Sequence, residues 1–432
     1  MSMPHTFSDH KYPQRLAAAK LSFPTSLTFD DKGTAYVAES GLDFGMESDE
    51  KMAGGRILKI LHDGGCEVLK DSLRQPVNGL VFYKGALYIS EGGHPGRLSR
   101  LDADGSLVTI LDGLPGPGNY QTNMMAIGPD SKIYFSQGAM TNSGIIGPDS
   151  YSLSWLRRLH PHDIPGYDVV LSGINAESSN PLGEKGGKVL TGAFVPFGTK
   201  TLPNQTVPSR IPCTAAVMRC DLDGGNLELF AWGFRNAYGL GFMPDGRLLA
   251  TEQSPDDRGS RPVGNAPDLL FEVRKGCWYG WPDFIGGEPV THPKFMPSRG
   301  NQPAFLLENH GSLPPPEPPL VRFPTHSTPV KFDVAPSKSR WAGQIFVALY
   351  GDIRPMAAPA GPNAARTVSR IDPTDWTVHN LALEGLARPI DVRFNTVDGM
   401  LYVLDFGRFE LGPKHEISAD SRGGCLWQVD LD

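Results

Sequence analysis

Polar and charged residues stand at both ends of several short apolar segments in this sequence. One set comes directly before such a segment and comprises Ser26, Asn78, Asn123, the pair Arg235 and Asn236, His326 and Arg388. A second set follows the next segment and comprises Glu39, Glu91, Gln137, Gln253, Asp352 and Asp405. If the segments are paired strands, both sets lie on one rim and form a concave polar pocket for a small ligand. The alternative is that these groups cap strands and bind water.

The segments that carry these residues are predicted to be β-hairpins, because β-branched and aromatic runs flank a turn centred on Asp-Gly or a substitute. The six copies are PTSLTFDDKGTAYVAES (24–40), PVNGLVFYKGALYISEGG (76–93), TNMMAIGPDSKIYFSQG (122–138), AYGLGFMPDGRLLATEQ (237–253), TPVKFDVAPSKSRWAGQIFVALYGD (328–352) and RPIDVRFNTVDGMLYVLDFG (388–407). Weaker strand pairs follow most copies. The pattern therefore predicts an all-β protein, a six-bladed β-propeller with four-stranded antiparallel blades, as a single domain over 1–432.

The spacing of the copies is uneven, and the surplus falls in two stretches. Residues 139–215 and 276–327 are predicted to be long insertions between strands, with a short helix at 151–159 as the one helical element.

Composition narrows the class of partner. The 432 residues include 50 glycines and 39 prolines, which recur between short apolar runs as in repeat folds. The net charge is −7 and no basic run of five or six residues occurs, so nucleic acid is not an expected partner. The apolar runs are strand-sized, so no membrane span is expected. The first residues lack the apolar core of a secretory signal. As written, the chain is expected to be cytoplasmic, or periplasmic if a leader was removed.

One stretch is similar to a known family. FAWGFRNAYGLGFMPDGRLLATEQSPDDRGSRPVGNAPDLLFEVRKGCWYGWPDF (230–284) resembles the glucose/sorbosone dehydrogenases, which are soluble β-propellers. GFRNAYGL, TEQSP with the acids after it, and YGWP carry the match in the same order and spacing. Elsewhere GPDSKIYFSQGAMTNSG, LTGAFVPFGT and the final RPIDV resemble the sorbosone-dehydrogenase-like branch.

The resemblance implies a cofactor pair, pyrroloquinoline quinone and Ca²⁺, and oxidation of a sugar, sugar aldehyde or polyol. It also implies a carbohydrate-like small-molecule substrate and an external electron acceptor. The quinone carries three carboxylates, which suit arginine. The residues implied for cofactor binding are Arg235, Asn236, Gln253, Arg388 and, beside them on the rim, Asn123. Those implied for calcium are Ser254, Pro255, Asp256 and Asp257, because main-chain carbonyls and acids suit a hard cation.

The catalytic set is expected to contain Arg235 and a general base. The family has a histidine in a His-x-Thr-Asn setting where this chain has Tyr120-Gln121-Thr122-Asn123. Histidine titrates near neutrality and can take the alcohol proton as hydride leaves, whereas tyrosine has an ordinary pKa of about 10. Either Tyr120 or a rim histidine, His326 or His94, is therefore expected to serve. Arg258 and Arg261 are expected either to hold anionic ligand groups or to anchor the loop after Asp257.

Three functions stay open from the sequence. The first is the quinone- and calcium-dependent oxidoreductase. The second is a propeller lactonase, hydrolase or lyase without redox cofactor, in which a rim metal activates water. The third is a non-catalytic carbohydrate-binding propeller.

Overall fold

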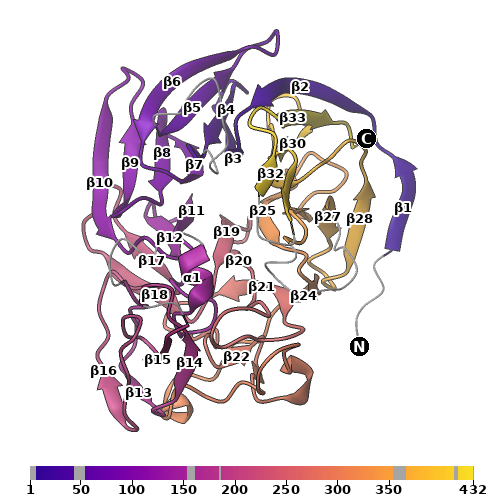
Figure 1. Cartoon of the computed structure of the whole chain (residues 1–432). Helices are drawn as coiled ribbons and strands as arrows, with labels where there is room; N and C mark the ends of the chain where they lie inside the picture. Colours follow the sequence, from indigo (N-terminus) through magenta and orange to yellow (C-terminus); the bar gives the residue numbers. More distant parts are fainter. Residues whose placement is uncertain are drawn as a thin grey trace.

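A computed structural model describes residues 6–42, 54–152, 161–183, 186–353, 366–412 and 417–431. Six antiparallel sheets are arranged as blades around a centre, as Figure 1 shows, and the first strand of each hairpin copy is innermost. The predicted six-bladed β-propeller is therefore confirmed.

The first four blades each have four strands. Blade 1 consists of β3 (Pro24–Phe29), β4 (Ala35–Glu39), β5 (Gly55–Ile60) and β6 (Cys66–Leu73). Blade 2 consists of β7 (Val77–Tyr83), β8 (Ala86–Glu91), β9 (Gly96–Leu101) and β10 (Leu107–Leu114). Blade 3 consists of β11 (Thr122–Ile127), β12 (Ile133–Gln137), β17 (Ala216–Cys220) and β18 (Glu228–Trp232). Blade 4 consists of β19 (Ala237–Phe242), β20 (Leu248–Glu252), β21 (Pro267–Val273) and β24 (Val321–Thr325).

The last two blades borrow strands from the start of the chain. Blade 5 consists of β25 (Pro329–Val334), β26 (Ile345–Leu349), β27 (Thr367–Ile371), β28 (Val378–Ala382) and β1 (Thr6–Lys11), which pairs with β28 in parallel. Blade 6 consists of β29 (Pro389–Phe394), β30 (Leu401–Asp405), β33 (Gly424–Val429) and β2 (Gln14–Leu21), which pairs antiparallel with β33. The early strand β2 thus closes the ring, and blade 5 departs from the predicted four strands by carrying a fifth.

The insertions contain small elements of their own. Residues 139–215 include α1 (Pro148–Ser152), β13 (Val169–Leu171) paired with β16 (Gln205–Val207), and β14 (Asn175–Ser179) paired with β15 (Lys188–Gly192). Residues 276–327 include β22 (Phe284–Ile285), β23 (Glu288–Pro289) and the 3₁₀ turns η1 (Pro293–Phe295) and η2 (His310–Ser312). This predicted insertion was too long, because its end forms β24, the fourth strand of blade 4. A further hairpin, β31 (Phe409–Leu411) and β32 (Ile417–Ala419), lies in blade 6. The helix expected at 151–159 overlaps α1 only at its start, and residues 153–160 lie outside the described part of the chain.

Aspartate side chains fix the hairpin turns of blades 1, 3, 4 and 6. In blade 1, Asp30 Oδ1 accepts the Lys32 and Thr34 backbone N–H groups at 2.9 and 2.8 Å, and Gly33 adopts a φ of 82°. An aspartate that accepts from the backbone two residues on stabilises a turn, and a glycine tolerates the left-handed conformation that follows. The Asp and Gly residues between two apolar segments therefore predict a hairpin because they form these turn hydrogen bonds and allow this conformation.

Acids at the end of the second strand tie it to the start of the first. Glu39 accepts the Ser22 N–H at 2.6 Å, Glu91 the Arg74 N–H at 2.6 Å, and Asp405 the Ala387 N–H at 2.7 Å. All three acids are at most 1% exposed. The strand-capping alternative is therefore correct for these three, because each accepts a backbone N–H within its blade; Glu39 and Glu91 also accept from Arg56 and Arg97.

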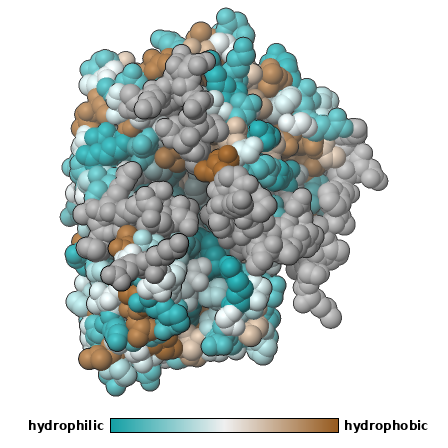
Figure 2. All heavy atoms as spheres, in the orientation of Figure 1, coloured by the Kyte–Doolittle hydropathy of each residue, from teal (hydrophilic) through white to brown (hydrophobic). Residues whose placement is uncertain are grey.

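The outer surface is mixed in polarity. Figure 2 shows hydrophobic residues in small groups among hydrophilic ones on the face that it presents. The exposed large hydrophobic residues come from separate elements, for example Leu16, Val68, Leu202 and Val397. In the described part of the chain, no helix has the length and apolar character needed to cross a membrane.

Candidate functional site

Arg235 and Asn236 lie at the start of β19, where the chain passes from blade 3 to blade 4. Their backbone N–H groups both donate to the Glu252 carboxylate at the end of β20, at 2.6 and 3.1 Å. The two side chains are 2% and 3% exposed. Blade 4 thus has an acid at the end of its second strand, as blades 1, 2 and 6 do. Glu252 holds the backbone of Arg235 in place through these bonds.

The Arg235 guanidinium is held by the loop after β20 and by the first insertion. It pairs with Asp256 at 2.5 Å, donates to the Gln253 carbonyl at 3.0 Å, and reaches both the carbonyl and side-chain oxygens of Asn142 at 3.2 and 2.8 Å. Its central carbon lies 4.5 Å from the centre of the Tyr120 ring. A buried cation is thereby matched by one carboxylate, several oxygens and an aromatic face, as burial of charge requires.

A second arginine shares the same carboxylate. Arg258 donates to Asp256 at 3.1 Å, to Asp149 at 2.5 Å and to the Tyr120 hydroxyl at 2.9 Å. Asn142 Nδ2 holds the carbonyls of Asp256 and Arg258 at 2.8 and 3.0 Å. Arg258 therefore anchors the loop, as one of the two sequence expectations had it.

Arg261 anchors the next part of that loop. It pairs with Asp283 at 2.8 Å and donates to the carbonyls of Ser143 and Pro282, each at 2.9 Å. Asn142, Asp149 and Ser143 belong to the first insertion, and sequence reasoning assigned none of them. The TNSG run was noted there for its family resemblance, and that run is the signal that marks Asn142.

Three carboxamides form a chain across neighbouring blades. Asn123 donates to Asn236 Oδ1 at 2.8 Å, Asn236 donates to Gln253 Oε1 at 2.7 Å, and Gln253 donates to the Pro329 carbonyl at 3.4 Å. Asn123 begins blade 3, Gln253 follows β20 of blade 4, and Pro329 begins blade 5. The structure thus brings these three predicted rim residues together at one end of the inner strands.

His326 lies beside Asp256, and Tyr120 contacts the two arginines that hold Asp256. His326 Nδ1 lies 3.8 Å from Asp256 Oδ1, and the imidazole is 19% exposed. Burial raises the pKa of Asp256, but Arg235 and Arg258 outweigh burial and leave that pKa below its ordinary value. Burial raises the pKa of the Tyr120 phenol in spite of the same arginines. Near neutral pH, Asp256 is therefore a carboxylate and Tyr120 a protonated phenol.

Comparison with known proteins gives one sequence match and many matches of fold. No family model matches the chain. The chain is 27% identical over 179 residues to quinoprotein glucose dehydrogenase B of Acinetobacter calcoaceticus, a match that covers 41% of this chain and 29% of that protein.

Among solved structures, a PQQ-bound aldose sugar dehydrogenase from Streptomyces coelicolor is 15% identical, with a TM-score of 0.56 over 97% of this chain and 99% of that one. The calcium structure of a Trichoderma reesei family AA12 protein is 14% identical, with a TM-score of 0.59 over 99% and 97%. The resemblance to quinoprotein sugar dehydrogenases is confirmed. The structural matches show similarity of fold alone. Membership in the sorbosone-dehydrogenase-like branch stays a prediction.

Arg388 lies apart from the cluster that Arg235 forms with Asp256, Arg258 and Tyr120, called the Arg235 cluster below. It donates to the carbonyls of Phe409 and Asp352, each at 2.7 Å, and pairs with Glu410 at 3.0 Å. Its central carbon lies 4.9 Å from the centre of the Tyr350 ring, and the residue is 1% exposed. In the described residues it shares no hydrogen bond with the Arg235 cluster, so its role in cofactor binding stays a prediction.

The loop implied for calcium offers some of the oxygens that such an ion needs. Ser254 donates its N–H to Asp268 at 3.0 Å, which fixes the start of this loop. Asp257 Oδ2 accepts the Ser298 N–H at 2.8 Å, whereas its buried Oδ1 has no hydrogen-bond partner among the residues that the structure describes. The Asp256 carboxylate is already paired with two arginines, Arg235 and Arg258. The described residues contain no cluster of three His, Cys, Asp or Glu side chains suited to a metal, so a cation here would depend on main-chain carbonyls together with Asp257.

Proposed function

We propose that this protein oxidises a sugar, sugar aldehyde or polyol with a quinone cofactor at the rim formed by Arg235, Asp256 and His326. The observation that supports it most is an ionised Asp256, held by two arginines and 3.8 Å from an imidazole. Such a pair resembles the arrangement that prepares histidine to accept a proton, because the carboxylate orients the ring and stabilises its charged form.

In this mechanism, His326 takes the substrate hydroxyl proton as the carbon-bound hydrogen leaves as hydride. Asp256 balances the imidazolium that results, and the 3.8 Å separation is one that catalytic hydrogen bonds shorten when substrate binds. Tyr120 remains protonated and donates a hydrogen bond to a substrate or cofactor oxygen. Quinone chemistry supplies the acceptor for the hydride.

The residues present suit the implied cofactors in part. The carboxamides of Asn123, Asn236 and Gln253 are hydrogen-bonding groups at the rim that would contact the quinone. The carbonyls of Ser254 and Pro255 with Asp257 would hold calcium, and the partnerless Asp257 oxygen is the feature that fits a cation. Arg235 already has protein partners for most of its N–H groups, so its main contribution is to hold Asp256 in place.

Calorimetric titration with pyrroloquinoline quinone, with and without Ca²⁺, tests this proposal. We expect near-stoichiometric binding that requires calcium, followed by sugar-dependent reduction of an artificial dye. Asp257→Asn should weaken the calcium-dependent binding at least tenfold. Asp63→Asn, which changes an exposed turn acid of blade 1, should leave it unchanged.

Other outcomes would overturn the proposal. Activity on lactones or sugars that persists without quinone and disappears on chelation would favour the metal-dependent hydrolase. A tight sugar complex with no turnover under any of these conditions would favour the carbohydrate-binding protein.

A further inference from the structure

Asp268 is a buried acid of blade 4 that lies close to the Arg235 cluster. It belongs to the third strand of the blade, β21, and its two oxygens accept backbone N–H groups from two different loops. Oδ1 accepts the Ser254 N–H at 3.0 Å, and Oδ2 accepts the Thr328 N–H at 2.8 Å. One carboxylate therefore joins the loop after β20 to the loop that precedes β25 of blade 5.

Each of these two loops carries one member of the proposed proton-transfer pair. Asp256 follows Ser254 by two residues, and His326 precedes Thr328 by two residues. The nearest atoms of the Asp256 carboxylate and the His326 imidazole are 3.8 Å apart. Asp268 thus anchors the backbone close to both members of the pair.

The loop that carries His326 has a backbone conformation that needs such an anchor. His326 and Thr328 adopt φ values of 62° and 50°, in the left-handed region that residues other than glycine disfavour. Residues persist there only where surrounding contacts hold them, and they concentrate at functional sites. Between them, the Ser327 hydroxyl and N–H both donate to the Pro324 carbonyl, at 2.8 and 3.2 Å. The direction of this turn is therefore set by hydrogen bonds.

Blade 5 holds the same turn through its carbonyl groups. The Ser327 and Thr328 carbonyls accept the N–H groups of Gly351 and Tyr350, at 3.1 and 3.0 Å. Asp268 holds the Thr328 N–H from the side of blade 4, where Asp256 lies. The bond from Thr328 to Asp268 therefore determines how the turn sits relative to Asp256, whereas the bonds within blade 5 do not.

We propose that Asp268 is a positioning residue that sets the separation between the His326 imidazole and the Asp256 carboxylate. The inference rests on the proposed function, in which His326 takes the substrate proton and Asp256 balances the resulting charge. Displacement of a reacting group by about 1 Å can lower a rate about a hundredfold. An anchor that the two loops share therefore affects turnover as well as stability.

The surroundings of the His326 ring can be followed by NMR of the protein with isotope-labelled histidine, without cofactor or substrate. Burial raises the pKa of Asp268 to about 7, so a spectrum at about pH 8.5 records the ionised carboxylate. In Asp268→Asn one oxygen becomes an NH₂ donor, which leaves one of the two backbone N–H groups without its acceptor. We expect the imidazole signal of His326, assigned by its loss in His326→Gln, to shift or broaden in Asp268→Asn.

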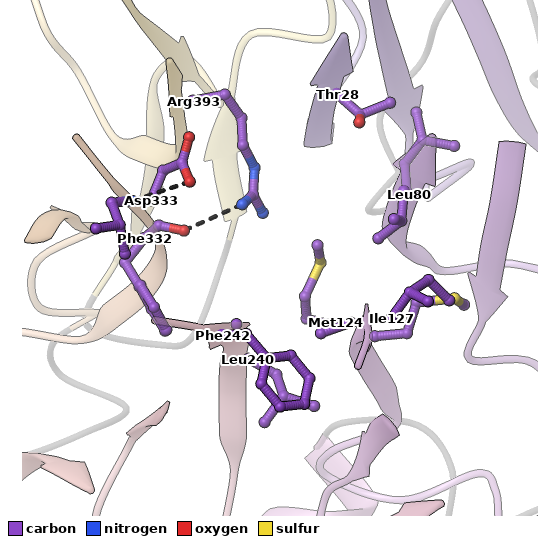
Figure 3. Close-up of a pocket in the computed structure, with 14 residues that line it drawn as sticks. Thr28, Leu80, Met124, Ile127, Leu240, Phe242, Phe332, Asp333 and Arg393 are labelled. Atoms are coloured by element: carbon purple, nitrogen blue, oxygen red, sulfur yellow. Dashed lines mark hydrogen bonds between the residues drawn. The ribbon is translucent and has the colours of Figure 1, made fainter. Parts of the chain in front are cut away.

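Asp333, near the other end of β25, provides a matched control. Its carboxylate also accepts two backbone N–H groups, those of Phe394 and Val334, at 2.8 and 2.9 Å. Figure 3 shows Asp333 in the wall of a pocket that is lined by later residues of the inner strands. Asp333→Asn should leave the His326 signal in place, although both variants should lower the unfolding temperature.

Steady-state kinetics at saturating quinone and Ca²⁺ give a second measurement. Asp268→Asn should lower kcat about tenfold to a hundredfold, with a change in KM for the sugar of less than about threefold. In the His326→Gln background the same substitution should have little further effect on kcat, because Asp268 acts through His326.

Asp268→Glu serves if thermal unfolding shows that Asp268→Asn is not folded. It keeps the carboxylate but adds one methylene group, so its oxygens cannot meet both N–H groups where they now lie, and the His326 signal should again shift. An unchanged His326 signal in the folded variants, an equal shift in Asp333→Asn, or a full additional loss of kcat in the His326→Gln background would overturn the proposal. A shifted signal in a protein that oxidises no sugar would support the role of Asp268 and contradict the proposed function.

Discussion

Arg235 and Arg388 are built on the same plan, yet their surroundings differ. Each precedes an innermost strand, donates its backbone N–H to a strand-end acid, and stacks over a tyrosine ring. Arg235 then meets the largely buried Asp256, which also contacts Arg258 and lies near His326. Arg388 instead meets main-chain carbonyls and Glu410, whose side chain is 39% exposed.

The difference shows how one structural device can serve two purposes. Around Arg388 the partners are mostly backbone oxygens, so the arginine fastens the hairpin β31–β32 and the end of β26 to blade 6. Around Arg235 the partner is a side-chain carboxylate kept ionised within reach of an imidazole. The position before an inner strand therefore ties both arginines to the fold, and the proposed chemistry of the Arg235 site rests on its side-chain partner Asp256.

The largest effect should come from removing the Asp256 charge. Asp256→Asn leaves Arg235 and Arg258 facing each other without their shared carboxylate, and loss of one partner from a buried ion pair costs about 3–5 kcal/mol. We expect a lower unfolding temperature and at least a hundredfold loss of sugar oxidation. The matched change Glu410→Gln should cost about 0–1 kcal/mol, since that acid is exposed, and should leave oxidation unchanged. Equal effects of the two variants would remove the distinction between the two arginine sites.

A smaller effect is expected at His326. His326→Gln keeps a polar side chain but removes the proton acceptor, so kcat should fall by about 10²–10⁴-fold. The unfolding temperature should change little, which separates this variant from Asp256→Asn. Steady-state kinetics with a dye acceptor would measure it. A loss in Tyr120→Phe that exceeds the loss in His326→Gln would assign the base to Tyr120.

The strand-end acid of blade 4 predicts a pH dependence of stability. Burial raises the pKa of Glu252 from its ordinary value of 4.5 to about 8, although the Arg235 and Asn236 N–H groups oppose the shift. The folded state therefore binds a proton that the unfolded state has released between these values. The free energy of unfolding should fall by about 1.4 kcal/mol per pH unit as pH rises from about 5 to 8.

Chemical denaturation across this pH range would measure that slope. Glu252→Gln cannot titrate, so its slope should be flatter even if its stability is lower at every pH. Burial also raises the pKa of Asp405, the corresponding acid of blade 6, so Asp405→Asn should flatten the slope in the same direction. A free energy of unfolding that rises with pH over this range would contradict the assignment.

The smallest effect is expected for the two tyrosine hydroxyls. Tyr120→Phe removes the bond from Arg258 at 2.9 Å and should cost about 0.5–1.5 kcal/mol, while the stacking of Arg235 on the ring remains. Tyr350→Phe leaves the stacking of Arg388 intact and should cost less. Thermal unfolding would rank the two variants. A larger loss of stability in Tyr350→Phe than in Tyr120→Phe would contradict this prediction.

Much of the fold could be predicted from the sequence because its signals are local. An apolar strand, an Asp-Gly turn and a second strand are read within about twenty residues, and turns such as that of Asp30 confirm the reading. The strands β1 and β2 could not be placed, because their pairing with β28 and β33 depends on closure of the whole ring.

The site was predictable where its residues adjoin a strand end. Arg235, Asn236 and Gln253 meet because they flank the hairpin β19–β20. Asn142 and Asp149 were missed because they lie in an insertion, whose path over the rim no periodicity encodes. Glu39, Glu91 and Asp405 could be placed at the rim, but only the geometry shows that their oxygens accept hydrogen bonds from within their own blades.

The pairing of β2 with β33 also determines when the ring can close during synthesis of the chain. A ribosome delivers β2 before any strand of blades 1 to 4, whereas β33 emerges after all of them. Until then β2 has no antiparallel neighbour, and its unpaired edge is open to wrong partners. The inner strands can pair within their own hairpins early, but the circle that aligns all six is completed last. A nascent chain that stops short of β33 would therefore hold every residue around Arg235 and still lack the closed ring that surrounds them.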